Sequence, residues 1–239
     1  MTPPVFSILG CIVLLVAFPL TRQLAGLLLS QADLAWSTSS RDWAKASAAP
    51  ADLQARLEDL RPPDHAVLDA PVSWILRGIW AVATAGALWA TEDPVAAGLL
   101  ILASVTLLTA AQVDLRAKIL PDVCVLLFAA CGILVCLIGH GPTPGDALIG
   151  SLAGFVTFLT LQVGFRVLRG REMLGLGDVK LFAAAGLWVG WQGLALVGLI
   201  ASLLGILQFT LTKRGSQSAI AFGPSLALAT LISLGVLAA

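Results

Sequence analysis

Two aspartates stand out because each one borders a long apolar stretch of the chain. Asp114 directly follows the apolar run 99–113, and Asp178 precedes the apolar run that begins at residue 181. An aspartate at the C-terminal end of a helix meets the negative end of the helix dipole, so helix stability does not explain Asp114. Two glycines precede Asp178 in the segment 175–178 and permit close approaches that larger residues would block.

Two neighbouring carboxyl groups are suited to the hydrolysis of a peptide bond. When two aspartates are held close together they share a proton, because both cannot ionise comfortably. One then acts as a base towards water while the other polarises the carbonyl group as an acid. Asp114 and Asp178 are the candidates for such a pair. The alternative is that each aspartate caps a helix or pairs with Arg116 or Lys180, and for Asp122 helix capping is the favoured interpretation.

The composition indicates whether the protein that carries these aspartates is surrounded by water or by lipid. The chain has 239 residues, of which 58% are hydrophobic and only 12% are charged, and its mean hydropathy is +0.94. Soluble domains carry about 25% charged residues, so the bilayer is the expected solvent. The formal net charge is +0 and no basic run occurs, so no nucleic-acid partner is predicted.

The apolar runs predict an all-α, polytopic membrane helix bundle with about eight transmembrane helices, each of about 20 residues. A straight helix over 181–211 would measure about 46 Å at 1.5 Å per residue, so we predict a break at 188–193. The expected domains are a first transmembrane helix (1–21), a cytoplasmic loop without zinc-binding cysteines (22–71) and a transmembrane catalytic domain (72–239). The predicted spans lie near 4–20, 72–90, 95–113, 123–139, 146–165, 179–192, 194–211 and 219–238.

The distribution of basic residues predicts the orientation. With the N-terminus outside, all 14 Lys and Arg residues fall in cytoplasmic loops or near cytoplasmic helix ends. The outer loops hold instead Glu92, Asp93, His140 and Asp146. We therefore expect a multi-pass protein of the bacterial inner membrane, with both termini periplasmic and both candidate aspartates at the cytoplasmic face. Tryptophans are expected in interfacial belts, with Trp74 at one face and Trp89, Trp188 and Trp191 at the other.

The cysteines and glycines predict packing rather than chemistry. No two of the four cysteines form a CxxC pair, and the two histidines are distant, so no metal site is expected. The cysteines are interpreted as small apolar packing residues, namely Cys11, Cys124, Cys131 and Cys136. The glycine pairs at 150 and 154 and at 186 and 190 predict close helix packing within the chain.

Three segments in this order resemble the motifs of type IV prepilin peptidases: 113–122, the GxGD-containing 171–181, and the Phe-Gly-Pro element in 221–228. The resemblance implies that Asp114 and Asp178 are the catalytic aspartates. It assigns Gly175, Gly177 and Lys180 to the second motif. These peptidases cut the short basic leader of type IV prepilins and type II secretion pseudopilins on the cytoplasmic side, before the hydrophobic helix of the substrate. Asp122 and Glu172 are tentative binding residues for the basic leader.

One departure from the family limits what the resemblance implies. Many members carry two CxxC pairs in the first cytoplasmic loop, whereas residues 21–71 contain no cysteine. Zinc is therefore not expected, and S-adenosylmethionine would be needed only if the methyltransferase activity of longer members is retained. Expected partners are prepilins or pseudopilins and membrane lipid. Two alternatives stay open: a GxGD protease with other membrane substrates, and a non-catalytic or transporter-like membrane protein.

Overall fold

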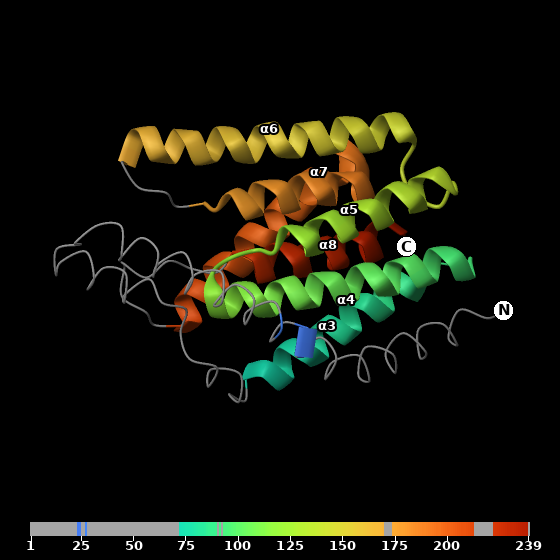
Figure 1. Ribbon diagram of the computed structural model, residues 1–239, viewed down its shortest axis with the longest axis horizontal. Helices are drawn as coiled ribbons and strands as arrows, with labels where there is room; N and C mark the ends of the chain where they lie inside the picture. The colour runs from blue at the N-terminus through green and yellow to red at the C-terminus, as the bar shows by residue number, and fades with distance from the viewer. Residues whose placement is uncertain are drawn as a thin grey trace, which may run out of the picture.

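The computed structural model describes residues 23, 24, 27, 72–89, 91, 93–169, 174–212 and 222–238. From residue 72 onward these ranges form six helices and no strand (Figure 1): α3 (Val72–Trp89), α4 (Pro94–Ala117), α5 (Asp122–Leu137), α6 (Pro144–Arg169), α7 (Leu176–Thr212) and α8 (Gly223–Ala238). The all-α prediction is confirmed for this part of the chain. The predicted first span at 4–20 and most of the loop 22–71 lie outside the described residues.

Several of these helices are long and apolar enough to cross a membrane. Three qualify by length and composition, over Pro94–Leu115, Pro144–Leu168 and Leu176–Thr210, and α5 and α8 are shorter apolar helices. Large apolar side chains such as Leu126, Leu152 and Val167 are exposed on the surface of the bundle. Such a surface is expected where lipid replaces water as the solvent. The count of eight transmembrane helices stays a prediction.

The helix α7 is divided at Gly190 into two halves that fold back on each other. Gly190 has φ 65° and ψ −178°, a conformation that is almost restricted to glycine. Phe182 and Gly198 would be about 24 Å apart in a straight helix. Instead, a Cβ atom placed on Gly198 would lie only 3.6 Å from the ring of Phe182. The break predicted at 188–193 is therefore confirmed, and the second half runs back along the first (Figure 1).

Glycines bring α6 into backbone contact with the first half of α7. A Cβ atom on Gly150 would lie 2.6 Å from the carbonyl oxygen of Gly186, and one on Gly154 would lie 2.9 Å from that of Phe182. Neither position leaves room for a methyl group unless the helices move apart. The predicted use of both glycine pairs for packing within the chain is confirmed.

The predicted tryptophan belt is wrong for Trp188, which is buried between α5 and α7. Its indole nitrogen donates a hydrogen bond to the carbonyl oxygen of Phe128 at 3.0 Å, and the two rings stack at 5.4 Å. The indole N–H finds its partner on a neighbouring helix, so burial is favoured over the interface. Trp191 is exposed, as expected, whereas the side chains of Trp74 and Trp89 lie outside the described residues.

The other predicted packing residues agree with the structure where it describes them. Cys124, Cys131 and Cys136 are buried free thiols within the apolar core, which confirms their interpretation as packing residues. Cys11 lies outside the described residues.

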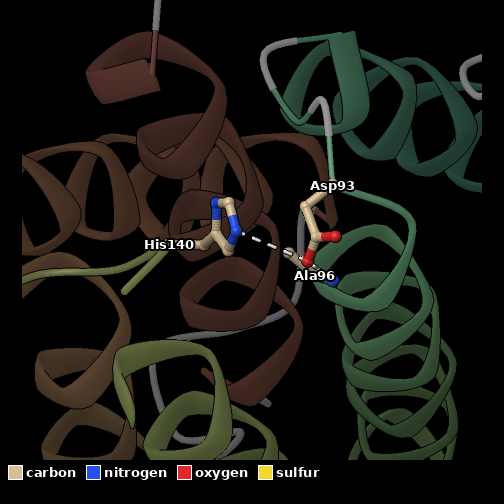
Figure 2. A network of polar contacts seen from close by, with 3 residues as sticks. All are labelled: Asp93, Ala96 and His140. Carbon is tan, nitrogen blue, oxygen red and sulfur yellow. Dashed lines mark hydrogen bonds and ion pairs between the residues drawn. The ribbon is translucent and has the colours of Figure 1, made fainter. Parts of the chain in front are cut away.

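One end of the bundle carries three of the residues that we predicted for the outer loops, namely Asp93, His140 and Asp146, whereas Glu92 lies outside the described residues. Asp93 caps α4 by accepting a hydrogen bond from the backbone N–H of Ala96 at 3.1 Å, and His140 Nε2 lies 3.4 Å from the same carboxylate (Figure 2). Asp146, in the first turn of α6, accepts a hydrogen bond from Trp191 near the bend of α7. Because α4 begins at this end, Asp114 lies at the opposite end, in the last turn of the helix.

Candidate active site

Asp114 is held against the start of α8. Its side chain is only 5% exposed, and Oδ2 accepts a hydrogen bond of 3.0 Å from the backbone N–H of Gly223. A Cβ atom on Gly223 would lie 2.7 Å from that oxygen, so only glycine allows this approach. The carboxyl group therefore faces the N-terminus of a helix, where the helix dipole favours negative charge. This contact explains why the Phe-Gly-Pro element belongs to the site although it is 109 residues away in sequence.

Asp178 is buried in the first turn of α7. It is 7% exposed, and its Oδ2 accepts a hydrogen bond of 3.3 Å from the backbone N–H of Gly175. The other oxygen, Oδ1, is buried and has no hydrogen-bond partner among the described residues. A buried carboxylate oxygen without a partner is costly. Here it supplies an acceptor that a water molecule or a substrate group would satisfy.

Leu120, which was not predicted as a site residue, contacts the segments that hold both carboxyl groups. A Cβ atom on Gly177 would lie 2.7 Å from Cβ of Leu120, and one on Gly223 would lie 3.0 Å from its Cδ1. Leu120 thus packs at once against the segment that carries Asp178 and the glycine that holds Asp114. Asp114 also interacts electrostatically with Asp178. The structure therefore brings the predicted pair together in one buried site.

The glycines of the second motif have separate roles in this site. Gly175 donates its backbone N–H to Asp178, whereas Gly177 allows α7 to approach Leu120. The signal for Leu120 was present in the sequence: it is an apolar residue directly before Pro121, in the short segment between α4 and α5. Its role became visible only when the packing partners were known.

Asp122 does not cap α5, contrary to the favoured interpretation. Pro121 is the N-cap residue, and Asp122 is the first residue of the helix. Its carboxylate lies 2.7 Å from Nζ of Lys180, and both side chains are about half exposed or more. Its charge is therefore paired with a lysine of α7 that lies 58 residues away in sequence. Glu172 lies outside the described residues.

The donor set of the site consists of carboxyl groups and backbone N–H groups. Among the residues that the structure describes, no three His, Cys, Asp or Glu side chains cluster as a metal would require. The expectations for zinc and S-adenosylmethionine stay predictions. The chemistry that this arrangement can perform is the transfer of protons between two neighbouring carboxyl groups and a bound water.

Comparison with known proteins shows which families and proteins the sequence of this chain resembles. Residues 101–210 match the model of the type IV leader peptidase family. Over 126 residues the chain is 40% identical to a prepilin leader peptidase/N-methyltransferase of Aeromonas hydrophila, a match that covers 51% of this chain and 43% of the relative. The protein of the same name in Escherichia coli K12 is 41% identical over 149 residues, covering 61% and 66% respectively. A third, from Pseudomonas aeruginosa, is 36% identical over 142 residues, covering 58% and 49%.

The chain thus spans about half the length of the first curated relatives that it matches. No solved structure matches the chain significantly.

Proposed function

We propose that this chain, whose residues 101–210 match the model of the type IV leader peptidase family, is a membrane aspartic endopeptidase that removes leader peptides. Its substrates are type IV prepilins or type II secretion pseudopilins. The observation that carries this proposal is the buried pair of Asp114 and Asp178, which three helices and two backbone N–H groups hold in place. The proposed catalytic unit lies within residues 72–239.

The pair performs the hydrolysis through one shared proton. The carboxylate takes a proton from the attacking water, while the protonated partner donates a hydrogen bond to the oxygen of the scissile carbonyl. The nitrogen of the leaving peptide then receives a proton from the pair, and the carboxyl groups return to their starting state. Oδ1 of Asp178 is the oxygen best placed to bind the water or the carbonyl, because Oδ2 of each aspartate already accepts a backbone hydrogen bond.

The site is proposed to face the cytoplasm, at the edge of the inner membrane. Its position opposite the end that carries Asp93 and His140 supports this orientation, because the basic residues of the sequence predict that end to be external. A scissile bond that precedes a hydrophobic helix can reach such an edge without the unwinding of a deep membrane span. The proposal covers the peptidase activity; the names of the relatives also include N-methyltransferase, an activity that we do not assign to this chain.

Co-expression with a membrane-anchored prepilin tests the proposal. We expect leader removal by the wild type and a loss of at least about 1,000-fold in Asp114→Asn and in Asp178→Asn, since each variant removes the acid–base function of the pair. Asp93→Asn is the matched control, because it changes an aspartate at the other end of the bundle to a residue that also caps helices well. Its processing should equal that of the wild type.

Processing that persists in both active-site variants would reject the two-aspartate mechanism. If the wild type processes no prepilin or pseudopilin, the substrate assignment is wrong. The alternatives of other membrane substrates or a transporter-like role would then take its place.

A further inference from the structure

An apolar groove opens between α6 and the second half of α7, and we call it the α6/α7 groove. Its volume is about 640 Å³. One wall is a single face of α6 with Thr157, Leu161 and Phe165, and the opposite wall is a face of α7 with Ala195, Gly198 and Ser202. Within each wall the residues are spaced three or four positions apart, so they lie on one face of their helix. Each face is about 10–12 Å long.

Three phenylalanines form the floor of the α6/α7 groove. The rings of Phe158 and Phe182 stack with centroids 3.9 Å apart, and Phe158 is also in ring contact with Phe222 at 6.3 Å. These residues come from α6, the first half of α7 and the segment before α8. Because Phe158 and Phe182 are buried, the floor is part of the packed core and keeps its shape without a ligand.

One end of the groove lies beside the segments that hold the catalytic pair. Leu174 and Phe222 both line it. Leu174 directly precedes Gly175, whose N–H holds Asp178, and Phe222 directly precedes Gly223, whose N–H holds Asp114. Two residues of the groove wall are therefore direct neighbours of the two glycines that hold the aspartates. The unpartnered Oδ1 of Asp178 marks the point where a substrate group would bind at this end.

The residues of the walls indicate which kind of ligand fits the groove. Leu161 is 45% exposed, so the groove is open from the side, towards the lipid that surrounds the predicted spans. A peptide segment that enters from lipid must satisfy its own backbone hydrogen bonds, and it does so as a helix. Gly198 carries no side chain, which allows a helix to approach the α7 wall closely.

We propose that the α6/α7 groove binds the apolar helix that follows the scissile bond of the substrate. This inference rests on the proposed function and adds to it the surface by which the enzyme recognises a membrane-anchored substrate. When the helix is bound in the groove, the peptide bond that precedes it lies next to Asp114 and Asp178, and the leader is cut there. A lipid acyl chain could enter the same groove, but it would have no connection to the two aspartates.

Site-specific photocrosslinking tests the position of the helix. The photoreactive residue p-benzoylphenylalanine replaces Leu161 or Ser202, one on each wall, in a protein that also carries Asp178→Asn so that substrate is not consumed. Val163 and Leu203 are the matched control positions, since both are exposed on the same helices and neither lines the groove. We expect substrate adducts from the two groove positions, at least about tenfold above the controls and mapped to the apolar helix.

Equal adducts from all four positions would overturn the proposal, and so would adducts only with lipid or with the protein's own chain. These results leave the proposed function intact, because the unmodified wild type is assayed in parallel for leader removal. If that wild type removes no leader, it is the proposed function that fails.

A variant that fills the groove provides a second test. In Gly198→Leu the new side chain would add bulk to the groove, because Gly198 lines it and the Cβ position is already in ordinary contact with the ring of Phe182 at 3.6 Å. We expect at least tenfold slower processing of the anchored substrate and unchanged cleavage of a short peptide that spans the scissile bond without the helix. Leu203→Phe, on the lipid-facing side, should process both like the wild type. Unchanged processing of the anchored substrate by Gly198→Leu would refute the assignment.

Discussion

The packing of Gly177 against Leu120 offers a demanding test of the site, because one added methyl group should disturb both aspartates. In Gly177→Ala the new Cβ atom would lie 2.7 Å from Cβ of Leu120, whereas ordinary contacts begin at 3.4 Å. The two segments must therefore separate by about 0.7 Å, more than the roughly 0.5 Å tolerance of a catalytic arrangement. The displaced Leu120 also packs on Gly223, which holds Asp114.

We expect a fall in kcat/KM of about 10- to 100-fold, which corresponds to roughly 1.4–2.7 kcal/mol of lost transition-state stabilisation. The assay is leader removal from a purified membrane-anchored prepilin in detergent, followed by densitometry over time. Size-exclusion chromatography and thermal unfolding show that the variant is folded. Gly164→Ala is the matched control, since a Cβ atom there meets nothing within 4 Å, and its activity should stay within twofold of the wild type.

The identity of the clashing atom sharpens this test. The atom that clashes with the new methyl group is Cβ of Leu120, which an alanine at position 120 would keep. The double variant Gly177→Ala with Leu120→Ala should therefore stay impaired. In the double variant Gly177→Ala with Leu120→Gly the clashing atom is absent, so part of the activity should return. Activity of Gly177→Ala within twofold of the wild type would refute the reasoning, because the close approach would then have no bearing on the positions of the aspartates.

Three further predictions concern the surroundings of the site and the core. Lys180→Met removes the ion pair with Asp122, and since both side chains are largely exposed we expect a change of only about 0–1 kcal/mol in unfolding free energy, measured by denaturation in mixed micelles. Trp188→Phe keeps a ring but loses the buried hydrogen bond to α5, which should cost about 1–2 kcal/mol in the same assay; an unchanged stability would mean that this bond is weak. Gly186→Ala meets the backbone of α6 and should cost about 3 kcal/mol, whereas Gly164→Ala should be neutral or slightly stabilising; equal stabilities of the two variants would contradict the close packing of α6 on α7.

The sequence alone determined the features that depend on residues close together along the chain, such as the extent of each helix. The length and apolar character of each run set the helices from α3 to α8, because an α-helix in lipid satisfies its backbone within its own segment. The break in α7 was visible for the same reason, since a continuous helix of that length would exceed the bilayer. The two aspartates were recognisable from their positions at the ends of apolar runs and from the motifs around them.

Only the tertiary structure decided which distant groups meet. It brought Gly223 to Asp114 across 109 residues, paired Asp122 with Lys180 rather than with its own helix, and placed Trp188 in the core instead of the interface. The packing role of Leu120 and the α6/α7 groove also depend on how the helices pack together. These features arise from side-chain packing between helices, which depends on the shapes of several faces together and is not encoded in any single run of residues.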